Sequence, residues 1–222
     1  MRTGSAVLDR LIATLPLEID GDLALCHDHG IAYQRDRGFV VDYGIDYWRK
    51  YISYEDSAIA RLINVGRASL VNKYVGIGGT VDIGIGSGEF IKYRPNTFGR
   101  DINPVAIQWL KQHDLWVDRL EEFESFSFWD VIEHVPEPEE YFRHVPVGSH
   151  LFASIPIFES IDAIRRSKHY RPGEHLYYFE EAGFVNWMEW HGFLLLDLQD
   201  FEIQAGREAI YSFAFKRIKV AA

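Results

Sequence analysis

The stretch TVDIGIGSGEF (residues 80–90) is the most informative part of the sequence. Its first four residues are mainly β-branched and predict a buried strand. Gly84, Gly86 and Gly88 then end this strand, and residues 89–93 form a short helix candidate. Glycine lets a backbone turn tightly and approach a ligand closely, although a plain turn also uses it. A strand, a glycine turn and a helix in this order are typical of the ligand-binding edge of an open α/β sheet.

Strand and helix candidates alternate along most of the chain. The strand candidates are apolar, β-rich runs, and the helix candidates between them are bounded by proline or glycine. Such alternation predicts an α/β fold with a mostly parallel sheet that helices cover on both faces. The predicted strands are residues 80–83, 97–100, 115–117, 126–129, 150–155, 193–197 and 210–216, and the predicted helices are residues 104–113, 137–145 and 179–191.

The N-terminal part of the chain has a different pattern. Residues 1–45 contain short apolar runs broken by glycines, which predict a small hairpin-like appendage. In residues 46–74 apolar side chains recur at intervals of three and four, which predicts one or two amphipathic helices. We expect this helical segment to form a lid, and residues 75–222 to form the main domain.

The composition favours a globular protein with a small ligand. The 222 residues are 47% hydrophobic, which is enough to close a sizeable core. The 33 acidic and 23 basic residues give a net charge of −10, which disfavours binding to nucleic acid or to an anionic membrane. Cys26 is the only cysteine, and no apolar run approaches the ~20 residues of a membrane span. We therefore expect a soluble protein of the cytoplasm, without a membrane partner.

One carboxylate indicates which ligand the glycine turn holds. Asp101 ends the second predicted strand, 19 residues after Asp82, where it can accept hydrogen bonds from both hydroxyls of a ribose. The dinucleotide-binding fingerprint is Gly-x-Gly-x-x-Gly or Ala, so after Gly84 and Gly86 it needs a small residue at position 89. Here the third glycine is one residue earlier, at Gly88, and position 89 is Glu89. Glu89 would also repel a phosphate, and no Gly-Lys-Ser/Thr sequence follows the turn. The turn therefore predicts a nucleoside cofactor without phosphate.

Three ordered motifs resemble those of the class I S-adenosylmethionine-dependent methyltransferases. The motifs are residues 81–90, 99–104 and 129–138, at the first, second and fourth predicted strands. The most similar branch includes ubiquinone-pathway O-methyltransferases and sugar C-methyltransferases, because of residues 133–138 and of Glu174-His175-Leu176. The resemblance covers about residues 75–218. It implies a Rossmann-like three-layer sandwich with a seven-stranded, mostly parallel sheet and an antiparallel last strand.

The resemblance also implies which residues hold the cofactor, S-adenosylmethionine. In this family the glycine turn lines the methionine part, and the acid after the second strand binds the ribose. Residues 88–101 are few for this family, so we expect a truncated first helix. Arg67 could reach the cofactor carboxylate by a charge-assisted pair, or bridge to surface acids instead. The other implied cofactor residues are Asp82, Gly84, Gly86 and Gly88 in the first motif, Asp101 and Ile102 in the second, Asp118 after the third strand, and Trp129 and Asp130 after the fourth.

Two histidines are candidates for catalysis. Methyl transfer from a sulfonium is an in-line displacement, so the enzyme mainly has to align the nucleophile with the methyl group. Where the acceptor must lose a proton, a histidine can serve as general base. His134, after the fourth strand, is the first candidate, although it could instead pack beneath the helix that follows. His175, in the polar loop after the fifth strand, is the second.

The loop of residues 161–175 is also the candidate substrate site. It has four Lys and Arg residues against two acids, a local charge of +2. We expect His169 and Arg171 to contact the substrate, and the charge favours an acidic or phosphorylated group on it. A solvated lid would carry the same charges. Tyr51 could roof the site, although its aromatic face could also belong to an ordinary docking helix.

Cys26, His27 and His29 are residue types that bind zinc. Structural zinc sites combine ligand pairs from separate segments, whereas adjacent side chains rarely converge on one ion. We therefore interpret residues 26–29 as a polar hairpin and expect no metal site.

The sequence thus predicts an enzyme that transfers a methyl group from S-adenosylmethionine to a small molecule and leaves S-adenosylhomocysteine. Three alternatives remain open. The glycine spacing and Glu89 disfavour a nicotinamide-dependent oxidoreductase. The net charge and the lack of an Asn-Pro-Pro-aromatic motif after the fourth strand disfavour a nucleic-acid base as acceptor. A non-catalytic protein that binds the cofactor would have the same motifs. Neither the acceptor atom nor the oligomeric state follows from the sequence.

Overall fold

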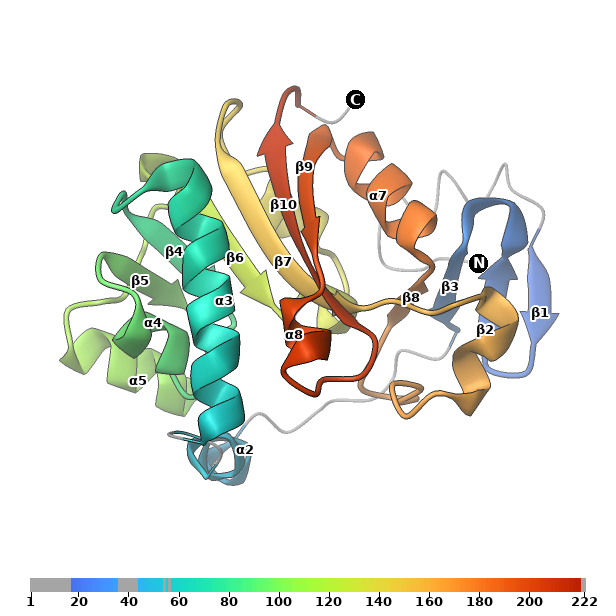
Figure 1. Ribbon diagram of the computed structural model, residues 1–222, viewed down its shortest axis with the longest axis horizontal. Helices are drawn as coiled ribbons and strands as arrows, with labels where there is room; N and C mark the ends of the chain where they lie inside the picture. The colour runs from blue at the N-terminus through green and yellow to red at the C-terminus, as the bar shows by residue number, and fades with distance from the viewer. Residues whose placement is uncertain (1–16, 36–43, 54, 56, 221–222) are drawn as a thin grey trace.

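A six-stranded sheet forms the centre of the computed structural model, which describes residues 17–35, 44–53, 55 and 57–220 (Figure 1). The strands are β4 (Thr80–Ile83), β5 (Thr97–Arg100), β6 (Ser125–Trp129), β7 (His150–Pro156), β9 (Phe193–Gln199) and β10 (Ile210–Arg217). Their order in the sheet is β5-β4-β6-β7-β10-β9. The first four are parallel, and β10 is antiparallel to both of its neighbours. The predicted α/β class and the antiparallel last strand are confirmed.

The predicted third strand is reduced to one contact with β5. The amide N–H of Gly99 donates to the Leu115 carbonyl at 2.8 Å, and that of Val117 donates to the Gly99 carbonyl at 3.1 Å. The chain enters this bridge from Asp114 at a φ of 57° and leaves it at Asp118. Two backbone hydrogen bonds form a bridge rather than a strand, so the prediction of seven strands is wrong by one in the described sheet.

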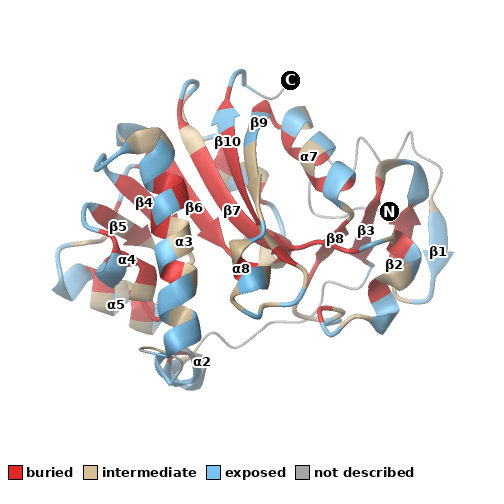
Figure 2. Ribbon diagram, in the orientation of Figure 1, coloured by how far each residue is buried: buried red, intermediate tan, exposed pale blue. Residues whose placement is uncertain are grey.

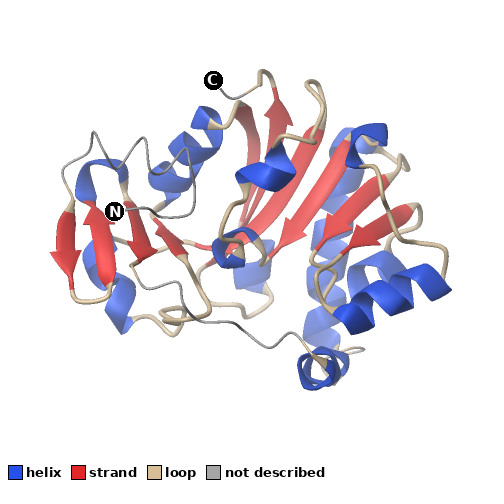
Figure 3. Cartoon of the chain, turned by 180° about the vertical axis from the view of Figure 1, so that it is seen from behind, coloured by secondary structure: helices blue, strands red, loops and turns tan. Residues whose placement is uncertain are grey.

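Helices cover both faces of this sheet (Figure 3). They are α2 (Ile45–Ile52), α3 (Ala58–Val75), α4 (Glu89–Tyr93), α5 (Pro104–Gln112), α6 (Glu139–Phe142), α7 (Glu181–Trp190) and α8 (Phe201–Gln204). On one face Val71 of α3 packs with Phe152 and Ala214. Phe213 and Phe215, the neighbours of Ala214 in β10, belong to the core on the other face, which α6 and α7 cover. This alternation is the two-residue period of a strand that is buried on both sides.

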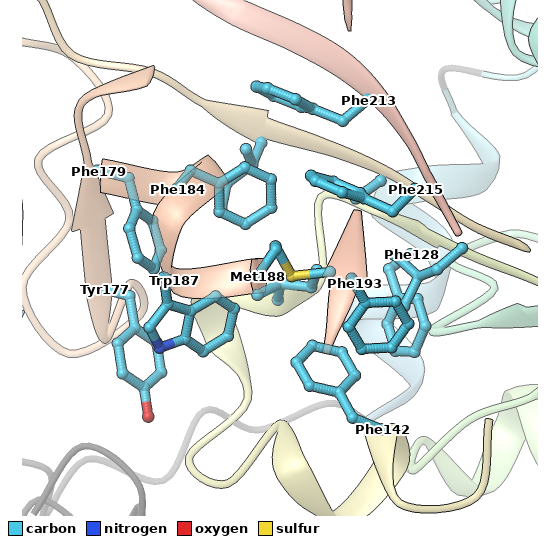
Figure 4. Close-up of a cluster of buried hydrophobic side chains, with 14 of the residues drawn as sticks. Phe128, Phe142, Tyr177, Phe179, Phe184, Trp187, Met188, Phe193, Phe213 and Phe215 are labelled. Carbon is cyan, nitrogen blue, oxygen red and sulfur yellow. The ribbon is translucent and has the colours of Figure 1, made fainter. Parts of the chain in front are cut away.

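Aromatic side chains fill the core beneath α7 (Figure 4). Phe184 and Trp187 come from the buried face of the helix, and both are fully buried. The ring of Phe184 meets that of Phe213 edge-on, with centroids 4.9 Å apart, and it also contacts Phe215. Figure 2 shows that burial is concentrated in the central strands of the six-stranded sheet, such as β6 and β7, whereas helix residues alternate between buried and exposed. This packing anchors β10 and the segment that precedes α7.

A second, antiparallel sheet contains the described N-terminal strands. Its order is β1-β2-β3-β8, with β1 (Glu18–Asp20), β2 (Leu23–Cys26), β3 (Ile31–Gln34) and β8 (Tyr177–Phe179). Because β8 lies between β7 and α7 in the chain, the N-terminal strands pair with a segment of the main domain. At Gly183 of α7 a Cβ atom would lie only 2.2 Å from the Gly30 carbonyl oxygen, so this helix packs directly on the turn before β3.

The helices differ from the predicted ones mainly at their ends. The helix predicted over residues 137–145 is regular only in α6, and Phe179, predicted as helical, belongs to β8. The amphipathic helices predicted within residues 46–74 correspond to α2 and α3. The Ser57 side chain starts α3 by accepting a hydrogen bond from the Ala60 amide at 3.0 Å. As expected, the helix after the glycine turn, α4, is short. No helix in the described ranges combines the length and apolarity needed to cross a membrane.

Candidate active site

A cavity of about 1150 Å³ opens at the carboxyl ends of the parallel strands. Its wall contains the loops after β4, β5 and β6, the residues of α3 that face them, and the segment that precedes β8. Ligands of open α/β sheets bind at this edge. Most of the sequence-predicted residues meet here: Arg67, Asp82, Gly84, Gly86, Asp101, Ile102, Trp129, Asp130, His134, His169, Arg171 and His175.

The glycine turn has a backbone that other residues would strain. Gly84, Gly86 and Gly88 have φ values of 72°, 57° and 77°. A Cβ atom on Gly84 would lie 2.6 Å from Cγ2 of Val131, in the loop after β6. One on Gly88 would lie 2.9 Å from the Trp109 ring. Gly84 and Gly86 face the cavity, whereas Gly88 is outside its wall and allows α4 to pack against α5.

Two carboxylates lie beside the glycine turn. Asp101 accepts a hydrogen bond from the Asn103 amide at 2.7 Å, and backbone N–H groups of the turn oppose the rise in its pKa that burial causes. Asp82 is 2% exposed and accepts a hydrogen bond from the Ser127 hydroxyl at 2.7 Å. Burial raises the pKa of Asp82 to about 7. The cavity therefore has acids on the side where the sequence places the cofactor.

A network of two arginines and two acids borders the cavity, and Arg67, Asp130 and Arg207 belong to its wall. Arg67 donates to Glu202 at 2.8 Å and to Asp130 at 3.0 Å, and Arg207 donates to both Asp130 oxygens at 2.8 and 2.9 Å. Arg207 also contacts Glu202, which is fully buried. Although burial acts in the opposite direction, Arg207 and Arg67 hold the pKa of Asp130 below its usual value. Of the two roles considered for Arg67, the structure contains the pairing with acids, of which Glu202 is buried and Asp130 partly buried.

Sequence reasoning missed Glu202 and Arg207 because they follow β9 and carry no motif. Arg207 belongs to the wall, and Glu202 pairs with it, because β10 returns antiparallel beside β7. Trp129 forms the floor between this network and α4: the Arg67 guanidinium lies 4.8 Å from its ring centroid, and Phe90 meets the ring edge-on.

Three side chains form a compact group on the other side of Asp130. Glu133 and His134 lie in a 3₁₀ turn, Ile132–His134, and His175 comes from the segment before β8. The His134 and His175 rings are 4.6 Å apart, edge to face, and His134 Nε2 is 3.9 Å from Glu133 Oε1. His134 Nδ1 lies 3.0 Å from the Glu174 carbonyl oxygen. Glu133 is 1% exposed and was missed as a site residue, although it lies within the third motif.

Burial sets the ionisation of this group. Burial, and then the charge of Asp130, raises the pKa of Glu133 well above its usual range. Burial lowers the pKa of His134, and burial together with His134 lowers the pKa of His175 to about 2. Both imidazoles are therefore neutral near pH 7 and can each offer a lone pair.

The basic loop before β8 is largely neutralised by acids. Arg165 pairs with Asp20 at 2.6 Å and with Asp22 at 2.8 Å, both from the N-terminal sheet. Lys168 pairs with Glu208, and Arg171 with Glu174. The local charge of +2 counted along the sequence therefore does not persist in the fold. His169 and Arg171 still line the cavity, and His169 Nε2 lies 2.7 Å from the Glu208 carbonyl oxygen.

Of two other sequence candidates, one lies apart from this wall and one falls outside the described side chains. Asp118 accepts a hydrogen bond from the Trp116 indole at 2.7 Å and is not part of the wall. Tyr51 belongs to α2, but its side chain is outside the described part of the structure. The Cys26 and His29 side chains contact each other at 3.3 Å at the turn between β2 and β3, and His27 pairs with Glu18.

Comparisons with known proteins identify the fold. No family model matches the sequence, and no curated protein matches it either. Solved structures do match. One is a possible histamine N-methyltransferase from Thermotoga maritima, with a TM-score of 0.54 and 14% sequence identity. The match covers 78% of this chain and 97% of that one. Another is the N-methyltransferase NodS of Bradyrhizobium japonicum with S-adenosylhomocysteine, with a TM-score of 0.54, 14% identity and coverages of 83% and 100%.

A third matching structure is 1,6-didemethyltoxoflavin-N1-methyltransferase from Burkholderia thailandensis, with a TM-score of 0.50, 13% identity and coverages of 93% and 100%. It was solved with 1,6-didemethyltoxoflavin and S-adenosylhomocysteine bound. The chain therefore has the fold of the S-adenosylmethionine-dependent methyltransferases, which its three sequence motifs predicted.

Proposed function

We propose that this protein transfers a methyl group from S-adenosylmethionine to a small-molecule acceptor. The observation that carries the proposal is the convergence of Gly84, Gly86 and Asp101 on one cavity at the carboxyl ends of β4 and β5. The turn leaves its backbone accessible, and the Asp101 carboxylate can accept hydrogen bonds from two ribose hydroxyls. The fold relatives crystallised with S-adenosylhomocysteine support this choice of cofactor.

The charges of the cavity suit a sulfonium cofactor. Asp101 lies beside the turn, and Glu89, Glu137 and Glu140 also belong to the wall. Negative charge there attracts the sulfonium cation and repels phosphate groups. Glu89 stands at the start of α4, where a dinucleotide would place its pyrophosphate. These charges favour methyl transfer over nicotinamide chemistry, and with the net charge of −10 they disfavour a nucleic-acid acceptor.

The reaction needs alignment more than it needs an enzyme nucleophile. An acceptor oxygen, nitrogen or carbon attacks the methyl carbon in line with the sulfur. The carbon–sulfur bond breaks, its electron pair passes to sulfur, and S-adenosylhomocysteine leaves. An acceptor that begins with a proton loses it, and His134, whose imidazole is neutral near pH 7, is the proposed base, whereas the pKa of about 2 makes His175 a weak base. Arg171 and His169 remain the proposed substrate contacts, and the paired charges around them no longer favour an acidic acceptor.

Methyl transfer can be tested with S-adenosylmethionine that carries tritium in its methyl group. The protein is incubated with panels of small phenols, amines, carboxylic acids and carbon acids, and extracted products are counted. Label in one class of acceptor, lost when Asp101 is replaced by Ala, supports the proposal. If S-adenosylhomocysteine binds but no acceptor is labelled, the alternative of a non-catalytic cofactor-binding protein gains the support instead.

A further inference from the structure

We infer that Glu133, His134 and His175 form a binding site for a divalent transition-metal ion, next to the proposed cofactor. The sequence predicted no metal site, because the metal-binding residue types considered there were those of residues 26–29, whose adjacent side chains rarely converge on one ion. In the described residues, these three side chains are the group whose ligand atoms come together, and all of those atoms lie within 4.8 Å of one another. Two imidazoles and one carboxylate are typical ligands of Zn²⁺, Co²⁺ and Fe²⁺.

The separation of the ligand atoms fits an ion between them. Metal–ligand bonds of about 2 Å to nitrogen and oxygen place two ligands of a tetrahedral ion roughly 3.3 Å apart. His134 Nε2 is 3.9 Å from Glu133 Oε1, so a small side-chain rotation brings this pair to coordination distance. The His175 ring stands edge to face against that of His134, with centroids 4.6 Å apart.

The backbone sets the tautomer that His134 needs as a ligand. Its Nδ1 lies 3.0 Å from the Glu174 carbonyl oxygen, so Nδ1 carries the proton and donates it in that hydrogen bond. The lone pair is then on Nε2, the atom that faces Glu133. Metal-binding histidines usually donate their second ring N–H to a carbonyl or carboxylate in this way, which fixes the ring orientation.

Two of the three side chains carry a buried polar atom without a partner. Within the described residues, Glu133 Oε2 and His175 Nδ1 have no hydrogen-bond partner. Each such atom costs free energy when it is removed from water, and two of them in one group need a physical reason. A cation that the group shares would provide one. By contrast, His169 in the same cavity has its Nε2 at 2.7 Å from a backbone carbonyl oxygen.

The position of the group suggests what the ion would do. All three residues line the same cavity as the glycine turn and Asp101. Three protein ligands leave at least one coordination position open, as in catalytic rather than structural sites. We assign this position to an oxygen or nitrogen atom of the acceptor. With the ion bound, the His134 lone pair is no longer free to act as a base, and the ion takes over this role. An acceptor hydroxyl held by the ion would lose its proton to solvent more readily, and its oxygen would then attack the methyl carbon while the carbon–sulfur bond breaks and its electron pair passes to sulfur.

Metal binding itself does not depend on the proposed function, whereas the acceptor role does. Purified protein is treated with a chelator, dialysed and titrated with Co²⁺, followed by visible absorption, and with Zn²⁺, followed by calorimetry. We expect one equivalent to bind, with at least tenfold weaker affinity in Glu133→Gln and in His134→Gln. His144→Gln is the matched control, since His144 also pairs with a glutamate, Glu121, but at an exposed position. It should bind the ion like the unmodified protein.

The site is contradicted if the folded protein binds no Co²⁺ or Zn²⁺, or if Glu133→Gln binds them unchanged. Circular dichroism of each variant shows whether it is folded, and Glu133→Gln keeps the shape of the side chain. S-adenosylhomocysteine is titrated into the same chelator-treated samples. Cofactor binding without metal binding overturns the metal site alone. Metal binding without cofactor binding overturns the proposed function, and with it the acceptor role of the ion.

Discussion

Replacing Gly84 with alanine should destabilise the protein through two separable effects. The φ of 72° is unfavourable for a residue with a Cβ atom, by about 1–2 kcal/mol. In addition, the new Cβ would lie 2.6 Å from Cγ2 and 3.3 Å from Cγ1 of Val131, and overpacking of this kind costs about 1–3 kcal/mol. We therefore expect Gly84→Ala to lower the free energy of unfolding by about 2–5 kcal/mol.

A control variant and a double variant separate the two effects. Gly148 has a φ of 98°, and a Cβ atom added to it would meet nothing within 4 Å, so Gly148→Ala measures backbone strain without a clash. Val131→Ala removes both methyl groups that the new Cβ would meet. The double variant Gly84→Ala/Val131→Ala should therefore be more stable than the sum of its single effects predicts, by about 1–3 kcal/mol.

Urea unfolding followed by far-ultraviolet circular dichroism measures all four variants and the unmodified protein. The reasoning is refuted if Gly84→Ala costs no more than Gly148→Ala and if the double variant shows no coupling. That result would mean that the loop after β6 moves freely away from the glycine turn. The close contact between these two loops would then not fix the shape of the proposed cofactor site.

Three further predictions concern buried groups. Because the folded protein keeps a proton on Asp82 up to about pH 7, its free energy of unfolding should fall by up to about 4 kcal/mol as pH rises from about 4 to 7. The free energy of unfolding of Asp82→Asn should not show this fall. The prediction is contradicted if the urea midpoints of this variant and of the unmodified protein depend equally on pH. Phe184→Ala should lower the free energy of unfolding by about 3–5 kcal/mol, because it empties a fully buried aromatic position. Leu194→Ala, at a residue 43% exposed, should lower it far less, and equal losses of thermal stability in the two variants would argue against the aromatic core. Arg94→Lys should lower the free energy of unfolding by about 1–3 kcal/mol, because the buried guanidinium donates to two carbonyls after α3 at 2.8 and 3.0 Å. An unchanged midpoint of urea unfolding would disprove this role.

Local patterns in the sequence were sufficient for the centre of the fold. The glycine turn and Asp101 follow strands whose apolar runs are visible directly, and the carboxyl ends of parallel strands meet at one edge. The cavity wall therefore contains most of the residues that the motifs singled out. Residues 115–117 were predicted as a strand because all three are apolar and favour extended backbone. How many hydrogen bonds such a segment forms depends on the strand beside it, and here it forms only the bridge at Trp116.

Contacts between distant segments were not predictable in the same way. The charge of residues 161–175 was neutralised by Asp20 and Asp22, which arrive from the N-terminal sheet. Arg207 reaches the cavity, and pairs with Glu202, through the antiparallel return of β10, and His175 reaches Glu133 through the segment before β8. A single sequence gives the residue types of such partners but not their pairing, because the pairing depends on how the strands are ordered in space.

Calorimetric titration with S-adenosylhomocysteine, with NAD as the parallel control, tests the central claim most directly. We predict saturable binding at one site for S-adenosylhomocysteine and none for NAD. Asp101→Ala should weaken that binding by about 10-fold to 150-fold, since hydrogen bonds to a charged group are worth about 1.5–3 kcal/mol. A folded sample that does not bind S-adenosylhomocysteine, or that binds NAD equally well, would contradict the account.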